Sequence, residues 1–329
     1  MKNRTFESTI LSLLFLGLLL IFLSTLRTPF SSPNHQLQSS TMTINIPQDD
    51  LDVVLAETSM ENKSLIIAMV NKAYVEGERS MLDLFMDGFL IGDGTQRLVE
   101  HLLIVATDQI SYRRCKFLRL HCYRLETDGV DYAEEKVYMS GDFIKMMWRR
   151  TLFLGDILKR GFDFIYTDTD ILWLRNPFSI LNPSEPFDFQ IACDRYEGDN
   201  GLAVNNGFVI VRSNKKTISL YETWYAKRKD YVGENEQAVL QKLMQNGIFR
   251  ELGLNVRLLD TVYFSGFCQN SRDIRLVVTV HANCCVTISA KLKDLTTVIH
   301  DWERAKKLSS DEKKKFEWSE HIACENSWN

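Results

Sequence analysis

Short apolar runs alternate with amphipathic stretches along the chain, and this alternation most strongly limits what the chain can fold into. Residues 65–70 (LIIAMV) and 102–106 (LLIVA) are runs of the buried-strand type, separated by apolar residues at helical spacing. Residues 141–161 form a long amphipathic pattern that ends at glycine, and the apolar run 162–166 follows at once. Strands that alternate with helices predict an α/β domain whose mostly parallel sheet is flanked by helices.

The N-terminus contains an apolar run without a charged residue. Residues 8–26 (STILSLLFLGLLLIFLSTL) are long enough to cross a bilayer, which needs about 20 apolar residues. Lys2 and Arg4 precede the run, which favours a cytosolic tail over residues 1–7 and a lumenal catalytic part. A cleaved signal peptide is the alternative, but the run exceeds the usual h-region and no A-x-A-like site follows. We therefore expect a transmembrane signal anchor and a single-pass type II membrane protein.

The rest of the chain divides by composition. Residues 27–63 are rich in Ser, Thr, Gln, Asn, Pro and Asp, and are predicted to form a flexible stem. Residues 64–305 are predicted to form one catalytic domain, and residues 306–329 a charged C-terminal tail. A chain of 329 residues with 45% hydrophobic composition can bury the core of such a domain. The net charge of −4 offers no basic field for phosphates, so nucleic acid is not an expected partner.

All seven cysteines lie in the part that is predicted to be lumenal. An oxidising compartment favours disulfides, and the odd number leaves at least one thiol free or shared with another chain. Cys115 and Cys122 would close a short local loop and are a plausible pair. The remaining pairings stay open, because spacing alone does not determine connectivity.

The sequence T-D-T-D at the end of the run 162–166 carries the clearest chemistry. In open α/β sheets, ligands bind beyond the carboxyl ends of the strands. Asp168 and Asp170 are one residue apart, so on an extended backbone their carboxylates would project to the same side. Mg²⁺ and Mn²⁺ prefer oxygen ligands from carboxylates and substrate phosphates. Solvated acidic turns also produce Asp-x-Asp, but the buried strand directly before this pair favours a metal site.

Several motifs along the chain, in order, resemble those of one enzyme family. They are YTDTDILWLRNPF, FQIACDRYEGD, NNGFVIVRSN, NEQAVL, LLDTVYFSGFC and VHANCC. Residues 65–302 are thus similar to the plant nucleotide-diphospho-sugar transferases of glycosyltransferase family 77. The resemblance implies a GT-A fold, with a Rossmann-like nucleotide-binding half in a mixed sheet and an acceptor-facing half. It also implies a Golgi enzyme that adds pentoses to cell-wall pectin or extensin-type glycoproteins.

The resemblance assigns a metal site to Asp168, Asp170 and His281. The two carboxylates match the family's DxD motif, which binds a divalent cation, Mn²⁺ or Mg²⁺, and through it the donor diphosphate. His281 follows the apolar run 276–280 and matches the late histidine that completes the metal shell; a hydrogen-bonded structural histidine is the alternative. Lys291 would contact the diphosphate as a point charge, although its distance from His281 along the chain differs from the spacing in related families.

Basic residues on the helix before the DxD strand are candidate donor-binding groups. Related enzymes use such a residue to hold the donor sugar or phosphate, and the candidates here are Lys145, Arg149 and Arg150. Because Arg149 and Arg150 differ by about 100° around a helix, at most one should point into the cleft. A solvated helix face is the alternative for all three. Asp194, which follows FQIAC, matches an acidic residue of the family and is expected to hold sugar hydroxyls.

Two further motifs are expected to lie near the transferred sugar. Asn205, Asn206 and Gly207 match the family's N-x-G-F segment, and an ordinary Asn-Gly turn is the alternative. Glu236 and Gln237 match an acidic-Gln pair that lies close to the anomeric carbon in related transferases. Charge and capping at a helix N-terminus would also explain this pair.

The sequence therefore predicts a Golgi glycosyltransferase. It would move a sugar from a nucleotide-diphosphate donor, expected to be UDP-linked, to a cell-wall polysaccharide or glycoprotein. Its partners would be the nucleotide sugar, the acceptor, the membrane and other proteins of a Golgi complex. Two alternatives use the same residues: a catalytically inactive scaffold subunit of such a complex, and a metal-dependent diphosphate hydrolase. The hydrolase ranks lower because the sequence lacks the His and Asp clusters of a two-metal site.

Overall fold

The computed structural model describes residues 49–328, apart from residues 128, 182–184 and 197–202. Its main element is a seven-stranded mixed sheet with the strand order β3-β2-β1-β4-β7-β6-β8. The strands are β1 (Ser64–Val70), β2 (Leu102–Ala106), β3 (His121–Arg124), β4 (Asp163–Thr167), β6 (Phe189–Arg195), β7 (Ala203–Val211) and β8 (Val256–Leu259). The predicted α/β class with a mixed sheet flanked by helices is confirmed.

The first four strands of the order β3-β2-β1-β4 are parallel, and β7 then pairs antiparallel with β4. Strand β6 is antiparallel to β7 and parallel to β8. The carboxyl ends of β1, β2 and β4 therefore meet at one edge of the sheet. Asn71, Thr107 and Asp168 are the residues that directly follow these three strands, so polar groups gather where ligands bind in open α/β sheets.

A second, three-stranded sheet has the order β5-β10-β9 and consists of β5 (Ile171–Trp173), β9 (Phe264–Gly266) and β10 (Thr279–His281). Strand β5 begins directly after Asp170, and β10 runs antiparallel to it with His281 opposite Ile171. This small sheet therefore carries one end of the T-D-T-D turn and the predicted histidine ligand side by side.

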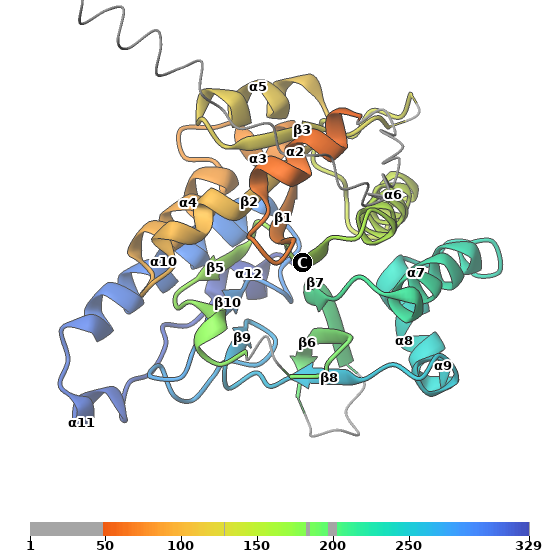
Figure 1. Cartoon of the computed structure of the whole chain (residues 1–329). Helices are drawn as coiled ribbons and strands as arrows, with labels where there is room; N and C mark the ends of the chain where they lie inside the picture. The colour runs from red at the N-terminus through yellow and green to blue at the C-terminus, as the bar shows by residue number, and fades with distance from the viewer. Residues whose placement is uncertain (1–48, 128, 182–184, 197–202, 329) are drawn as a thin grey trace, which may run out of the picture. The chain divides into compact units, whose positions relative to one another are not determined.

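Helices cover both faces of the large sheet (Figure 1). Because strand side chains alternate, Leu65 and Ile67 pack in a core with α6 and α7, whereas Ile66 and Ala68 pack in a second core with α4. The helices are α2 (Asp50–Thr58), α3 (Lys72–Val75), α4 (Met81–Ile91), α5 (Gln109–Phe117), α6 (Gly141–Lys159), α7 (Lys215–Lys227), α8 (Glu236–Gln245), α9 (Ile248–Glu251), α10 (Ile288–Lys306), α11 (Ser310–Lys313) and α12 (Ile322–Asn326), with short 3₁₀ turns η1 (Gln96–His101) and η2 (Pro177–Ser179).

Helix α6 leads into β4 and has the bounds that its sequence predicts. The Ser140 side chain caps it by accepting a hydrogen bond from the Phe143 amide, and Gly161 follows its last turn with a φ of 81°. A left-handed residue there ends the helix and returns the chain to β4. The C-terminal part of α6 therefore packs against β4, the strand that directly precedes Asp168.

The prediction of a stem over residues 27–63 is wrong for its last part. Helix α2 (Asp50–Thr58) belongs to the folded unit, since Leu51 and Leu55 are buried in its core. Arg160, at the end of α6, makes ion pairs with Asp49 and Asp52 that hold this helix in place. The helical spacing of Leu51 and Leu55 was hidden among polar residues.

The prediction of a charged tail over residues 306–329 is also wrong. Trp318 donates a hydrogen bond to the Ser271 carbonyl, and Cys324 is buried in a disulfide with Cys285. Charged residues are frequent here because α11 faces solvent, while the aromatic and cysteine residues between them fasten the segment to the domain.

Residues 1–48 lie outside the described part of the chain, and with them the predicted cytosolic tail, the anchor at residues 8–26 and most of the stem. Within the described ranges, no helix combines the length and the apolar character that crossing a bilayer requires.

Six of the seven cysteines form disulfides. The predicted local pair Cys115–Cys122 is confirmed, and Cys193 is free and buried. The other two bonds, Cys268–Cys284 and Cys285–Cys324, use adjacent cysteines just after β10. They join the segment that follows His281 to two distant parts of the chain.

Candidate active site

A cavity of about 300 Å³ opens where the large sheet and the small sheet meet. The predicted metal ligands line it, together with polar groups from both sheets and apolar side chains from α6. The lining includes Asn71, Tyr74, Thr107, Tyr138, Phe143, Met146, Met147, Arg150, Asp168, Asp170, Asp194, Asn205, Gly207, Glu236, Gln237, His281, Asn283, Lys291 and Trp328.

Asp168, Asp170 and His281 each direct one ligand atom to a common point, and these atoms lie within 4.8 Å of one another. The sequence suggested that both aspartates lie on an extended strand and project to the same side. In the structure, β4 ends at Thr167 and Asp170 lies in a turn. The turn is fixed from the small sheet, because the Ala282 amide donates to the Asp170 carbonyl at 3.0 Å. Two carboxylates and an imidazole are a donor set that fits a divalent cation.

Gly207 leaves the space in which these ligands meet. A Cβ at this position would lie 2.6 Å from Asp168 Oδ2, 2.7 Å from His281 Cε1 and 2.9 Å from Asn205 Oδ1. A side chain at position 207 would therefore clash with the site, and glycine is the residue that leaves enough space. Its amide donates to Asn205 Oδ1 at 2.8 Å, and its carbonyl accepts from the Asp168 amide at 2.7 Å.

Asp170 is held by Lys291 and His281. Its side chain is 5% exposed, with Lys291 Nζ 2.7 Å from Oδ2 and His281 Nε2 3.4 Å from Oδ1. Burial alone would raise the pKa of Asp170, but the charges of Lys291 and His281 outweigh it and hold this pKa well below its usual range. Asp170 is therefore an ionised carboxylate, and Lys291, the doubtful candidate of the sequence analysis, lies in the site.

The same charges act on the partners of Asp170. Burial would lower the pKa of Lys291, but Asp170 raises it strongly, so the ammonium stays charged. The pKa of His281 is likewise raised, because the attraction of Asp170 exceeds the effect of burial. Lys291 thus brings a fixed positive charge to the edge of the proposed cation site, where a diphosphate would lie.

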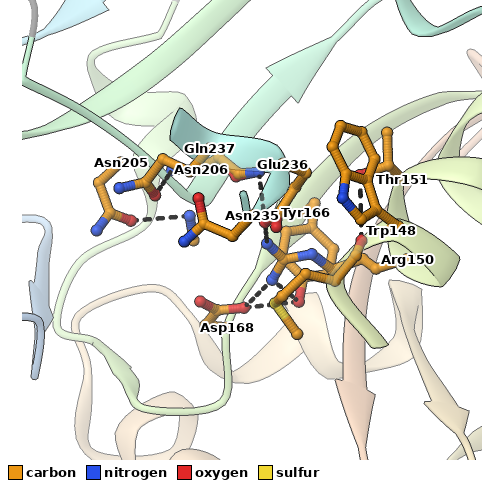
Figure 2. Close-up of polar contacts among 12 residues, drawn as sticks. Trp148, Arg150, Thr151, Tyr166, Asp168, Asn205, Asn206, Asn235, Glu236 and Gln237 are labelled. Carbon is orange, nitrogen blue, oxygen red and sulfur yellow. Dashed lines mark hydrogen bonds and ion pairs between the residues drawn. The ribbon is translucent and has the colours of Figure 1, made fainter. Parts of the chain in front are cut away.

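Asp168 belongs to a second polar network, centred on Arg150 (Figure 2). The Arg150 side chain is buried and donates to Asp168 Oδ1 at 2.9 Å, to Tyr166 Oη at 3.0 Å and to Glu236 Oε1 at 2.6 Å. Tyr166 also donates to Asp168 Oδ1, at 2.6 Å. Asp168 Oδ1 thus accepts two hydrogen bonds from other residues of the protein, whereas Oδ2 faces Gly207.

Glu236 and Asn206 present unpaired oxygens in a buried place. Glu236 Oε1 accepts from Arg150 and from Asn206 Nδ2 at 3.1 Å, while Glu236 Oε2 and Asn206 Oδ1 have no hydrogen-bond partner among the residues that the structure describes. Burial raises the pKa of Glu236 despite the charge of Arg150. Gln237 Oε1 accepts from the Asn206 amide at 3.0 Å. A buried acceptor without a donor is costly, so a bound hydroxyl would satisfy this pair.

Asp194 forms a third group with two asparagines. Its Oδ1 accepts from Asn205 Nδ2 at 2.7 Å and from Asn283 Nδ2 at 2.8 Å. Asn205 begins the predicted Asn-Asn-Gly motif, and all three of its residues lie within β7, so this motif is part of a strand and not a turn. The asparagines orient the Asp194 carboxylate at the wall of the cavity.

Three predicted site residues do not line the cavity: Lys145, Arg149 and Asn206. Asn206 still supports the site, because its amide donates to Gln237 and its side chain donates to Glu236. Lys145 pairs with Asp142 in solvent at 3.2 Å, and Arg149 donates to the Glu126 carbonyl at 3.0 Å. The cavity-facing side chains of α6 are Phe143, Met146, Met147 and Arg150, which share one side of a helix. The expectation that at most one of Arg149 and Arg150 faces the cleft is confirmed, and Arg150 is that residue.

The sequence analysis missed three contributors to the site. Tyr74 is buried next to Lys291 and Asp170, and burial raises its pKa to about 12, so it remains a neutral phenol. Tyr166 bonds Asp168, and Asn283 orients Asp194. Tyr166 and Asn283 could have been found from position, since each lies two residues from a predicted metal ligand. Tyr74 lies in the short helix α3 after β1, far in the sequence from the predicted ligands, so its position did not point to the site.

Fold and site together define an α/β enzyme whose polar cavity holds two carboxylates and an imidazole that could bind a cation. The comparisons with known proteins agree: a model of the nucleotide-diphospho-sugar transferase family matches residues 97–295. An uncharacterized protein of Arabidopsis thaliana is 51% identical over 302 residues, which are 90% of this chain and 90% of that protein. The chain belongs to the nucleotide-diphospho-sugar transferase family, and it is a glycosyltransferase.

Two relatives with named activities match shorter stretches. The UDP-galactose:fucoside alpha-3-galactosyltransferase of Dictyostelium discoideum is 32% identical over 101 residues, 30% of this chain and 16% of that protein. The UDP-D-xylose:L-fucose alpha-1,3-D-xylosyltransferase 3 of Arabidopsis thaliana is 24% identical over 124 residues, 38% of this chain and 30% of that protein. Among solved structures, mouse xyloside xylosyltransferase 1 aligns with 67% of this chain and 98% of its own, at 14% identity and a TM-score of 0.42.

Proposed function

We propose that the chain transfers a sugar from a UDP-linked donor to a cell-wall polysaccharide or glycoprotein, with Mn²⁺ or Mg²⁺ held by Asp168, Asp170 and His281. The observation that carries this proposal is the convergence of these three side chains just beyond the carboxyl end of β4, where Gly207 leaves room beside Asp168 and His281. The names of two relatives, which act with UDP-galactose and UDP-xylose, support UDP as the nucleotide and xylose as a candidate sugar.

The donor would lie along the cavity in an order that its polar groups define. The nucleoside belongs at the carboxyl ends of β1 and β2, next to Asn71 and Thr107. The diphosphate belongs between the metal ligands and Lys291, whose ammonium is a fixed counter-charge. When bound, the cation neutralises negative charge that develops on the leaving diphosphate.

The transferred sugar would lie on the far side of the metal ligands. Asp194, Glu236 and Gln237 line this side, and each offers a carboxylate or amide oxygen that can accept a hydrogen bond from a sugar hydroxyl. The unpaired Oε2 of Glu236, a residue of the cavity lining, favours the same placement, because a sugar hydroxyl would supply the donor that it lacks among the described residues. We propose that these residues orient the sugar for attack by the acceptor hydroxyl.

The location is proposed from the N-terminal sequence. Residues 8–26 have the length and apolar character of a signal anchor, and Lys2 and Arg4 favour a lumenal catalytic domain. The disulfides suit an oxidising lumen. We propose a type II protein of the Golgi membrane, with other glycosylation proteins as neighbours.

A donor screen tests the proposal. Purified lumenal domain is incubated with Mn²⁺ and a panel of UDP- and GDP-sugars, and release of the nucleotide is compared between wild type and Asp170→Ala. We expect turnover with a UDP-sugar that the variant lacks and that an added wall-polymer acceptor increases. Turnover that ignores every acceptor would indicate a hydrolase, and turnover with GDP-sugars alone would contradict the UDP assignment.

A further inference from the structure

Trp328 presents an exposed aromatic ring at the edge of the active-site cavity. The residue is 58% exposed and belongs to the cavity lining. Its indole Nε1 donates to the Cys284 carbonyl at 3.0 Å, so the polar atom of the ring is satisfied by the protein. The ring is thereby oriented, and its apolar face is left to solvent.

The segment that carries Trp328 is fastened to the loop that follows His281. The Cys285–Cys324 disulfide joins the two covalently, and Ser327 Oγ accepts from the Val286 amide at 3.0 Å. The Cys324 amide donates to the carboxylate of Asp294, a residue of α10, at 2.7 Å. A covalent bond and a hydrogen bond at Cys324, within α12, and a hydrogen bond at Ser327, directly after it, therefore fix the ring relative to the metal ligands.

A second exposed ring lines the cavity from a distant part of the sequence. Tyr138 is 49% exposed and packs edge-on against Phe143, with 5.3 Å between the ring centroids. Met146 and Met147 of α6 continue the apolar lining next to them. The lining thus changes in character, from charged and buried at the metal ligands to aromatic and exposed at Tyr138 and Trp328.

The exposed rings suit the acceptor better than the donor. The groups proposed for the donor diphosphate and sugar are buried or half-buried, with Asp170 4% and Glu236 2% exposed, whereas the two rings are 49% and 58% exposed. A polymer or glycoprotein acceptor is too large for a 300 Å³ cavity and must contact its exposed parts. Sugar rings carry an apolar C–H face, and aromatic rings are the groups that cover such faces.

We propose that Trp328, together with Tyr138, forms an acceptor subsite that stacks on the apolar face of a sugar ring in the acceptor glycan. This inference rests on the proposed function, since it places the acceptor next to a UDP-sugar site. It assigns a role in acceptor recognition to the residues around Trp328, which the Cys285–Cys324 disulfide holds beside the cavity.

Ligand-observed NMR tests the subsite without requiring turnover. The probes are methyl glycosides of L-fucose, D-galactose and L-arabinose, added to the protein with UDP and Mn²⁺. We expect Trp328→Ala to weaken binding of the glycoside that the wild type binds by about tenfold. Trp328→Phe keeps an aromatic face and should retain most of the affinity, whereas the affinity for UDP, measured by calorimetry, should be the same in all variants.

Ile322→Ala is the matched control, because Ile322 is a 55% exposed apolar residue of the same segment that does not line the cavity. It should bind both ligands as the wild type does. The inference is overturned if Trp328→Ala weakens UDP instead of the glycoside, if it changes neither, or if the wild type binds none of the glycosides. Failure of the proposed function would show itself differently, as a wild type that does not bind UDP with Mn²⁺.

Discussion

Asp168 and Asp170 follow the same strand, yet two different regions of the molecule hold them. Asp168 faces the large sheet and α6, where Arg150 occupies one of its oxygens, and its side chain is 30% exposed. Asp170 faces the small sheet and α10, where Lys291 and His281 surround it, and its side chain is 5% exposed. The proposed cation site therefore lies where the two regions meet, and the two carboxylates differ in what their removal leaves behind.

The largest difference should appear when each carboxylate is made neutral. Asp170→Asn leaves Lys291 charged and buried without a partner, which costs about 3–5 kcal/mol of unfolding free energy. Loss of a metal ligand should lower kcat/KM on the order of a thousandfold. Asp168→Asn should lower activity similarly but stability less, because Arg150 keeps its pair with Glu236. Denaturant unfolding of both variants checks this, and equal losses of stability would show that the two regions are equivalent.

Filling the space between the regions should have the next largest effect. Gly207→Ala places a Cβ 2.6 Å from Asp168 Oδ2 and 2.7 Å from His281 Cε1, so the ligands must move apart. We expect Mn²⁺ affinity, measured by calorimetry, to fall about a hundredfold. Gly141→Ala is the control, because a Cβ there meets nothing within 4 Å. Unchanged Mn²⁺ binding in Gly207→Ala would mean that the cation does not bind at this point.

Removing the arginine tests the large-sheet region alone. Arg150→Met deprives Asp168 and Glu236 of their common partner, and supporting residues of this kind are worth about 10–100-fold in metal affinity or activity. Arg149→Met, one position earlier on α6, should have no effect on kcat/KM, since Arg149 donates to the Glu126 carbonyl and is not among the residues that line the cavity. Steady-state kinetics of the two variants tests this prediction. Equal kcat/KM values would show that Arg150 does not support the site.

Removing the lysine tests the small-sheet region and should have the smallest effect at neutral pH. Lys291→Met takes away a charge-assisted contact to the diphosphate, and UDP affinity should fall about tenfold. Lys291 also keeps the pKa of Asp170 low, so in the variant this pKa rises toward the value that burial favours. Mn²⁺ binding should then be lost at a higher pH than in wild type as the solution is acidified. Identical acid profiles of Mn²⁺ binding would contradict the role of Lys291.

The parts of the site that the sequence predicted are those with a local signal. The strand before Asp168 and the helix that begins at Glu236 can each be recognised from a few adjacent residues. The choice among Lys145, Arg149 and Arg150 could also have been made, because only Arg150 shares a helix face with Phe143, Met146 and Met147. That face looks like ordinary core until one knows that a cavity lies beside it.

The parts that could not be predicted depend on contacts between distant segments. The three-stranded sheet consists of strands of three residues each, too short for a periodic pattern, and it fixes both Asp170 and His281. The sequence predicts a charged tail over residues 306–329 because charged residues outnumber the few aromatic and cysteine residues that pack against the domain. Their place beside the cavity follows from the Cys285–Cys324 bond, and spacing cannot reveal a pairing over 39 residues.

The central claim is that Asp168, Asp170 and His281 form a cation site through which the protein holds a nucleoside diphosphate. Calorimetric titration of UDP into the wild type, with Mn²⁺ and again with EDTA, tests it most directly, with His281→Ala as the comparison. We predict UDP binding that requires Mn²⁺ and that the variant weakens in the presence of the metal. UDP affinity that is the same with Mn²⁺ and with EDTA, and the same in His281→Ala, would contradict it.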